Sequence, residues 1–129
     1  MPREIRADKL PAIPKATLSY GIATENLLFI SGQVAIDPKT NKYTQGTIEE
    51  QTKLTLQNVK VVIEAAGASM SDIVKVGAII TKREHFAAFD ATYRTFFEPP
   101  YPARTTIVAL LAEPKVLVEV EAIVELKKD

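Results

Sequence analysis

The sequence predicts an α+β domain in which two helices cover one face of a sheet. The first observation is the order of the periodic segments, which is β-β-α-β-α-β-β without an internal repeat. The second is the segment 116–126, where alternate residues are uniformly apolar, as expected of a strand that packs under helices. The third is the length of 129 residues, which corresponds to a single domain over residues 1–129.

The first part of the chain is expected to form a hairpin. Pro11 and Pro14 interrupt an N-terminal arm, and apolar segments typical of strands follow at 18–24 and 27–34. The polar step 24–26 between these segments suits a tight turn. Antiparallel pairing of the two strands is therefore predicted.

A long helix should follow the polar loop at 37–41. Thr47 and Glu50 have the spacing of a capping box, in which each side chain bonds the backbone N–H of the other residue. The apolar positions that then recur at helical spacing are Leu56, Val59, Ile63 and Ala66. Gly67 suits the left-handed conformation that ends many helices, so we expect the helix between Thr47 and Gly67.

The second half is expected to add a strand, a shorter helix and two further strands. Residues 73–81 are rich in β-branched side chains and are typical of a strand. Thr81 and Glu84 again have capping-box spacing, and aromatic residues within 86–97 mark one face of the helix they would begin. Pro99 follows this face and should end the helix. The last two strands are expected at 105–111 and 116–126.

The composition argues against several classes of site. Lys and Arg (16) balance Asp and Glu (16), so the basic excess typical of nucleic-acid or anionic-membrane binding is missing. Without cysteine and with one histidine, His85, thiolate zinc sites and histidine-rich metal sites are not expected. Apolar runs are far shorter than the ~20 residues of a membrane helix. With no signal peptide visible, we expect a soluble, cytoplasmic protein.

The two faces of the last predicted strand differ. The face expected under the helices carries Val116, Val118, Val120, Ala122 and Val124. The opposite face mixes aliphatic and acidic residues, namely Leu117, Glu119, Glu121, Ile123 and Glu125. One side of the preceding strand has a similar mixed character, with Arg104, Thr106, Val108 and Leu110. A half-apolar face that no helix covers usually packs against another subunit, so an oligomer is expected.

Charged residues on these strands are the main candidates for chemistry. Arg104 follows Pro102, and a guanidinium held rigidly at the start of a strand suits bidentate recognition of a carboxylate; a salt bridge to Glu119 or Glu121 is the alternative. Glu119 and Glu121 share a face, where burial and like charge would raise one pKa, as acid–base catalysis requires. Neutralisation of both by basic residues is the alternative. Gly32 could bring backbone N–H groups to an anion, or could serve only a turn.

The aromatic helix offers two further residues. Its aromatic cluster is expected to form core, and Phe89 is the member that could reach a pocket wall. His85, at the start of the helix, is expected to be exposed. The sequence contains no phosphate loop, nucleophile elbow or dinucleotide fingerprint.

Several segments resemble the RidA/YjgF family in the same order. They are 28–33 (Leu-Phe-Ile-Ser-Gly-Gln) with the Asp-Pro step at 37–38 and Gly46, then 57–59 and 64–69 with 72–75, then 102–106 (Pro-Ala-Arg-Thr-Thr), and 118–123 (Val-Glu-Val-Glu-Ala-Ile). The resemblance covers nearly the whole chain, from about residue 18 to residue 126. It implies the chorismate-mutase-like fold with a mixed sheet, and a homotrimer whose sheets form a central barrel with pockets in the subunit clefts.

The resemblance also implies an activity. Archetypal members hydrolyse reactive 2-imino or enamine acids to 2-oxo acids and ammonia, without a cofactor or metal. Carried over by motif, Arg104 would bind the substrate carboxylate, assisted by the backbone around Thr106 and Gly32, and Glu119 would position or activate the attacking water. Phe89 and Asp90 would lie near the substrate.

Three positions depart from the archetype. Leu18 stands where the archetype has a pocket tyrosine, although Tyr20 is two residues away. Asp90 replaces an asparagine of the second helix and would put negative charge near an anionic substrate, unless it points to solvent or caps a backbone group. Thr106 replaces a cysteine whose backbone matters more than its thiol. The first two departures indicate a divergent subgroup.

Two functions from different classes follow. The first is an imine or enamine deaminase that acts on small carboxylates. The second is a non-catalytic trimer that binds a small carboxylate metabolite or a protein partner. Both require Arg104, and they differ in whether Glu119 acts in catalysis. The older family name, an endoribonuclease, implies RNA cleavage, which the zero net charge of this chain does not favour.

Overall fold

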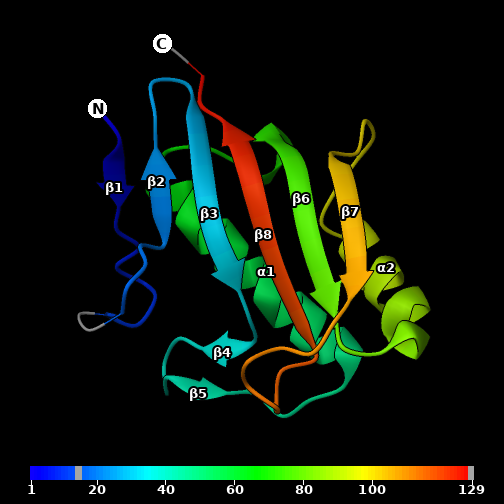
Figure 1. Ribbon diagram of the computed structural model, residues 1–129. Coiled ribbons are helices and arrows are strands. Elements are labelled where there is room, and N and C mark those ends of the chain that lie inside the picture. The colour runs from blue at the N-terminus through cyan, green and yellow to red at the C-terminus, as the bar shows by residue number, and fades with distance from the viewer. Residues whose placement is uncertain (14–15, 128–129) are drawn as a thin grey trace.

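Two α-helices lie behind one face of a six-stranded sheet in the computed structural model, which describes residues 1–13 and 16–127 (Figure 1). The elements are β1 (Arg3–Ile5), β2 (Gly21–Ala23), β3 (Leu27–Gln33), β4 (Ile36–Asp37), β5 (Lys42–Tyr43), α1 (Ile48–Ala65), β6 (Ile73–Ile80), α2 (Phe86–Arg94), β7 (Ala103–Val108) and β8 (Val118–Glu125). The predicted α+β class is confirmed. The domain bounds 1–129 stay a prediction, and Pro14 of the predicted arm lies outside the described residues.

The main sheet is mixed, as the resemblance implies. Its strand order is β1-β2-β3-β8-β6-β7, so the last strand of the chain lies at the centre. β6 and β7 are parallel, and the other neighbours are antiparallel. Parallel neighbours need a crossover connection, and α2 supplies it. β7 is left at one edge of the sheet with an unpaired backbone row within the described part of the chain.

The first helix begins and ends where the sequence predicts. The N–H of Glu50 donates to Thr47 Oγ1 at 3.1 Å, and the N–H of Thr47 donates to Glu50 Oε1 at 3.2 Å, which confirms the capping box. Gly67 adopts a φ of 80° directly after the helix, in the left-handed region that glycine tolerates best. Leu56, Val59 and Ile63 are at most 1% exposed, so the predicted stripe forms core.

The second predicted capping box does not form. The N–H of Thr81 donates to Leu117 O at 3.1 Å, so Thr81 continues the sheet and cannot begin a helix. A 3-10 turn at Arg83–His85 follows, and α2 begins at Phe86 with His85 as its N-cap and no side-chain capping bond. His85 is half-buried rather than exposed, and α2 ends at Arg94, before Pro99.

The shortest strands, β1, β4 and β5, are not predicted from the sequence. β1 has three residues, and β4 and β5 have two each, which is too short for an alternating pattern to stand out. Predicted strands were also too long at several ends, since β2 covers only Gly21–Ala23 and β7 ends at Val108. Leu110 therefore lies beyond the sheet and is 92% exposed.

The core lies between β8 and the helices, as predicted. The apolar row of this segment is 0–4% exposed at Val116, Val118, Val120, Ala122 and Val124. Val118, Val120, Ala122 and Val124 join residues of both helices and of β3 and β6 in one buried cluster. The opposite row of β8 lies on the face that carries no helix, the front of the sheet in Figure 1, which we call the open face.

The prediction that Arg104, Thr106 and Val108 lie on the face without helices is wrong. Arg104 and Val108 pair in register with Val76 and Ile80, which are 1% exposed beneath the helices. Arg104, Thr106 and Val108 therefore share the helix-covered face. The β7 residues on the open face are Ala103, Thr105 and Ile107. A shift of one residue reverses the faces of a strand, and alternation within 105–111 does not show which set points to the helices.

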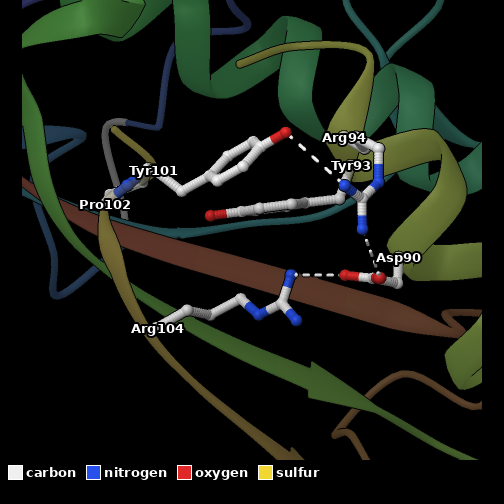
Figure 2. A pocket seen from close by; sticks show the side chains of 6 residues that line it. All are labelled: Asp90, Tyr93, Arg94, Tyr101, Pro102 and Arg104. Atoms are coloured by element: carbon white, nitrogen blue, oxygen red, sulfur yellow. Dashed lines mark hydrogen bonds and ion pairs between the residues drawn. The ribbon is translucent and has the colours of Figure 1, made fainter. Parts of the chain in front are cut away.

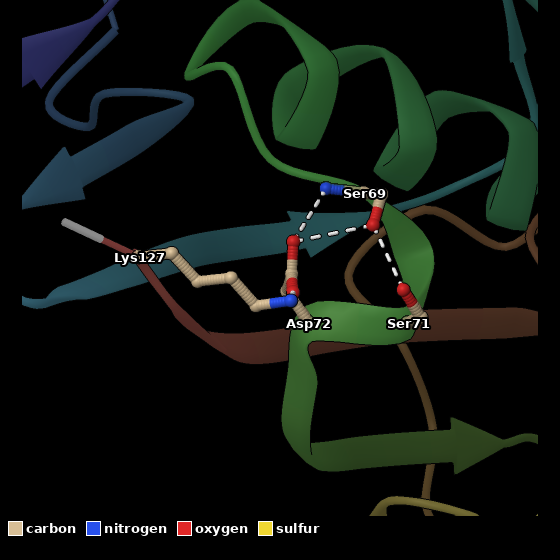
Figure 3. A network of polar contacts seen from close by, with 4 residues as sticks. All are labelled: Ser69, Ser71, Asp72 and Lys127. Atoms are coloured by element: carbon tan, nitrogen blue, oxygen red, sulfur yellow. Dashed lines mark hydrogen bonds and ion pairs between the residues drawn. The ribbon is translucent and has the colours of Figure 1, made fainter. Parts of the chain in front are cut away.

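A polar network joins the turn before β6 to Lys127, two residues beyond the end of β8 (Figure 3). The N–H of Ser69 donates to Asp72 Oδ2 at 3.0 Å, and Lys127 Nζ lies 3.2 Å from Asp72 Oδ1. Burial would raise the pKa of Asp72, but the Ser69 and Lys127 hydrogen bonds outweigh it and hold the pKa below its ordinary value. No helix among the described residues is long and apolar enough to cross a membrane.

Candidate active site

Glu119 lies against a glycine of the neighbouring strand on the open face. A Cβ placed on Gly32 would be 2.8 Å from both Cδ and Oε2 of Glu119. The register of β3 and β8 shifts between Ile30 and Gln33, so Gly32 sits at an irregularity inside a strand and not in a turn. Glu121 has the same relation to Gly77, whose Cβ would be 2.7 Å from Oε1. Each glycine leaves the space that a carboxylate occupies.

The environment of Glu119 favours its protonated form. Burial raises the pKa of Glu119 above its ordinary value, and the neighbouring charge of Glu121 raises it further. The spacing of the pair predicts the effect of Glu121, whereas the burial of Glu119 was expected only with a partner chain over this face. No ion pair engages either carboxylate within the described part of the chain, and the alternative, neutralisation of an interface pair by arginine or lysine, stays a prediction.

A cavity of about 330 Å³ lies beside Glu119, and we call it the Glu119 cavity. Gly32, Leu18 and Tyr20 also line it. Leu18 is 56% exposed, and Tyr20 donates its hydroxyl to the carbonyl of Pro11 at 2.6 Å. The Tyr20 hydroxyl therefore binds the N-terminal arm, and a role of Tyr20 in place of the archetype's tyrosine stays a prediction.

Two buried amide side chains of α1, Asn58 and Gln51, bind backbone groups of the segments around this cavity. The sequence alone predicts no role for either residue. Asn58 Nδ2 donates to the carbonyls of Val34 and Ile36 at 3.0 and 2.9 Å. Gln51 Nε2 donates to Lys115 O at 3.1 Å, and its Oε1 accepts from the N–H of Leu117 at 2.9 Å. The signal in the sequence is the presence of these amides within the helix, on a buried face that also carries Thr52 and Thr55.

Arg104 lies in a second cavity of about 320 Å³, on the side of the sheet that faces α2 (Figure 2). The residues that line this Arg104 cavity are Asp90, Tyr93, Arg94, Tyr101, Pro102 and Arg104. Arg104 Nη1 is 2.9 Å from Asp90 Oδ1, and both side chains are mostly buried. The predicted alternative of a salt bridge to Glu119 or Glu121 is wrong within one chain, because those carboxylates face the other way.

Aromatic rings of α2 support the Arg104 guanidinium. Its Cζ lies 4.5 Å from the ring centroid of Tyr93, 5.5 Å from that of Phe89 and 5.8 Å from that of Phe86. Phe89 is fully buried, so it backs Arg104 and does not form a pocket wall. Thr106 points to the same side, and its Oγ1 is buried without a hydrogen-bond partner in the described part of the chain.

One chain thus holds two separate halves of the predicted site. Gly32, Glu119 and Leu18 lie together, and Asp90 and Arg104 lie together, but β6 separates β7 from β8 and the two halves face opposite sides of the sheet. Among residues 1–13 and 16–127, no group of three His, Asp or Glu side chains is arranged to hold a metal ion.

Comparison with known proteins identifies relatives over nearly the full length. The model of the family described as endoribonuclease L-PSP matches residues 10–126. A RutC family protein of Pyrococcus horikoshii is 38% identical over 110 residues, covering 85% of this chain and 87% of the relative. A protein of Dermatophagoides farinae named 2-iminobutanoate/2-iminopropanoate deaminase is 33% identical over 123 residues, covering 95% and 96%.

Solved structures with a similar fold include proteins of comparable sequence identity. The crystal structure of Escherichia coli TdcF with bound serine matches with a TM-score of 0.87 and 32% identity, covering 97% of this chain and 99% of that chain. The similarity therefore extends over the strands that carry both cavities of this chain. The chain belongs to the endoribonuclease L-PSP family, which is also called the RidA/YjgF/RutC family.

Proposed function

We propose that this protein hydrolyses 2-imino acids to 2-oxo acids and ammonia in sites shared between the subunits of a homotrimer. The observation that carries the proposal is the pairing of two incomplete halves. One half offers a partly buried arginine for a carboxylate, and the other offers Glu119 with a raised pKa. The name of the mite relative, a 2-iminobutanoate/2-iminopropanoate deaminase, supports the same reaction.

The reaction needs orientation and one proton carrier. Two N–H groups of Arg104 bind the substrate carboxylate, with backbone groups near Thr106 and Gly32 beside it. Glu119 accepts a proton from water as the oxygen attacks the imine carbon and passes it to the nitrogen, which gives a tetrahedral carbon that bears a hydroxyl and an amino group. Glu119 then transfers the hydroxyl proton to the amino group, which leaves as ammonia while the C–N bond breaks and the C=O bond of the 2-oxo acid forms. No cofactor is required, because the imine carbon is already electrophilic.

The open face supports the trimer. Phe29 is 43% exposed and Ile107 is 49% exposed, and both lie on the face that no helix covers. Apolar side chains with this exposure favour contact with another subunit. Packing of three open faces into a barrel of the chorismate-mutase type would put the edge strand β7 of one subunit against the Glu119 cavity of the next.

Mixing two inactive variants tests the shared site. Arg104→Ala and Glu119→Gln should each be inactive toward 2-iminobutanoate made in situ by a pyridoxal-phosphate deaminating enzyme. After joint unfolding and refolding at equal amounts, about one quarter of the wild-type activity should return, because one subunit pair in four then combines an intact Arg104 with an intact Glu119. Formation of 2-oxobutanoate is measured.

Light scattering provides the control, since the wild type and both variants should have the mass of three chains. Trimers that regain no activity on mixing, while the wild type is active, would show that Arg104 and Glu119 act within one subunit. A wild type that binds 2-oxobutanoate but accelerates no imine would instead favour a non-catalytic trimer that binds small carboxylates.

Gly32→Ala should lower the activity without unfolding the chain. The added Cβ requires the space of the Glu119 carboxyl group, so Glu119 must move away from the proposed attacking water. We expect a loss of about 10–100-fold in kcat/KM, within the range of general acid–base contributions. Gly77→Ala is the matched control, because it displaces Glu121 in the same way. Equal losses in the two variants would contradict a special role of Glu119.

A further inference from the structure

Asp90 lies between two guanidinium groups (Figure 2). Its Oδ1 is 2.9 Å from Arg104 Nη1, and its Oδ2 is 3.6 Å from Arg94 Nη2. Arg94 follows Asp90 by one turn of α2, whereas Arg104 comes from β7. The two arginines reach the carboxylate from different elements, so one carboxylate has two alternative partners.

Arg94 is held at the rim of the Arg104 cavity. Its Nη1 donates to the hydroxyl of Tyr101 at 3.5 Å, and its Cζ lies 5.8 Å from the Tyr101 ring centroid. These contacts orient the guanidinium although 64% of the Arg94 side chain is exposed. With two arginines and one aspartate, the charged residues that line this cavity carry one net positive charge.

The ion pair between Asp90 and Arg104 competes with the ligand proposed above. A substrate carboxylate needs two parallel N–H groups of Arg104, and Asp90 already occupies one of its terminal nitrogens. A bound substrate would also place like charge beside Asp90, whose side chain is only 28% exposed. Water alone stabilises the charge of such a partly buried carboxylate poorly. Arg94, whose Nη2 is 3.6 Å from Asp90 Oδ2, is the other cation next to it.

We propose that Arg94 is a positioning residue that retains the Asp90 carboxylate when a substrate carboxylate takes Arg104. This inference rests on the proposed function, because it requires Arg104 to bind the substrate. Asp90 exchanges one guanidinium for the other, and neither carboxylate is left without a cation. Arg94 therefore matters for binding only while residue 90 carries a negative charge.

Four proteins test this dependence, namely the wild type, Arg94→Gln, Asp90→Asn and the double variant. Calorimetry measures the Kd for 2-oxobutanoate at neutral pH and constant ionic strength. Arg94→Gln should weaken binding about two- to fivefold in the wild-type background, the size of a partly exposed ion pair, and should change Kd little in the Asp90→Asn background. Because Glu119 is untouched, KM for the imine should rise with Kd while kcat stays constant.

Two control variants distinguish the loss of the Arg94–Asp90 contact from a general effect of removing a positive charge. Arg83→Gln removes the same charge from the exposed turn before α2 and should leave Kd unchanged. Arg94→Lys keeps a charge near Asp90 and should lose less affinity than Arg94→Gln. Circular dichroism and light scattering check that each variant retains its fold and mass.

The outcomes are distinct. Equal losses from Arg94→Gln in both backgrounds would show that Arg94 acts on the ligand directly and would overturn the exchange, as would no loss in either background. Either result leaves the proposed function intact if Arg104→Ala still abolishes binding. A wild type without measurable affinity for 2-oxobutanoate would overturn the proposed function and this inference together.

Discussion

Arg104→Ala should abolish the binding of small 2-oxo acids and leave the assembly folded. Each hydrogen bond to a charged group is worth about 1.5–3 kcal/mol, so loss of two should weaken binding by at least about 100-fold. Asp90 makes the loss more severe, because without Arg104 its carboxylate stays beside the position of the ligand with Arg94 as its remaining partner. Calorimetry with 2-oxobutanoate measures the affinity, and light scattering measures the mass.

Arg104→Lys distinguishes geometry from charge. Lysine keeps the positive charge but presents an ammonium group, which does not form two parallel hydrogen bonds with a carboxylate. It also loses the planar contact with the Tyr93 ring, which lies 4.5 Å from the guanidinium carbon. We therefore expect poor rescue. Unchanged affinity in Arg104→Ala would show that the pair with Asp90 serves only to join β7 to α2.

Local signals predicted the fold where tertiary contacts agree with them. The capping box of Thr47 and Glu50 forms because neither residue is hydrogen-bonded into a strand. The apolar row of β8 is buried because every residue of that row is apolar. The box of Thr81 and Glu84 has the same spacing, yet β6 and the segment before β8 hold Thr81 in the sheet. Spacing alone does not reveal which of the two competing hydrogen-bond arrangements is formed.

The candidate site was predictable residue by residue but not in its arrangement. Glu119 and Glu121 share a face because residues two apart on a strand always do, so their mutual repulsion followed from spacing, whereas the burial that mainly raises the pKa of Glu119 did not. The face of Arg104 depends on the register of β7 against β6, which no local pattern contains. The pairing with Asp90 depends in turn on where α2 crosses the sheet. The sequence therefore predicts the candidate residues without showing on which face of the sheet each of them lies.

Glu119→Gln should stabilise the folded chain at neutral pH. The folded-state pKa of Glu119 is raised by burial and by Glu121, so folding favours the protonated form. Such a group contributes its stability fully below the unfolded-state pKa, and that contribution is lost as pH rises through the higher folded-state pKa. Glutamine lacks the ionised form, so the variant should have a higher Tm than the wild type at neutral pH. The gain should vanish below about pH 4. Thermal unfolding across this pH range measures it.

The same substitution should remove most of the catalysis while ligand binding remains. Glutamine keeps the volume beside Gly32 and a hydrogen-bonding oxygen, but it does not accept a proton from water. General acid–base groups contribute about 10²–10⁴-fold, so kcat for 2-iminobutanoate should fall by that order while the Kd for 2-oxobutanoate changes little. Glu121→Gln is the matched control, since Glu121 has the same relation to Gly77 but lies outside the Glu119 cavity, and it should lose far less activity. Wild-type rates in Glu119→Gln would require the proton carrier to be another group.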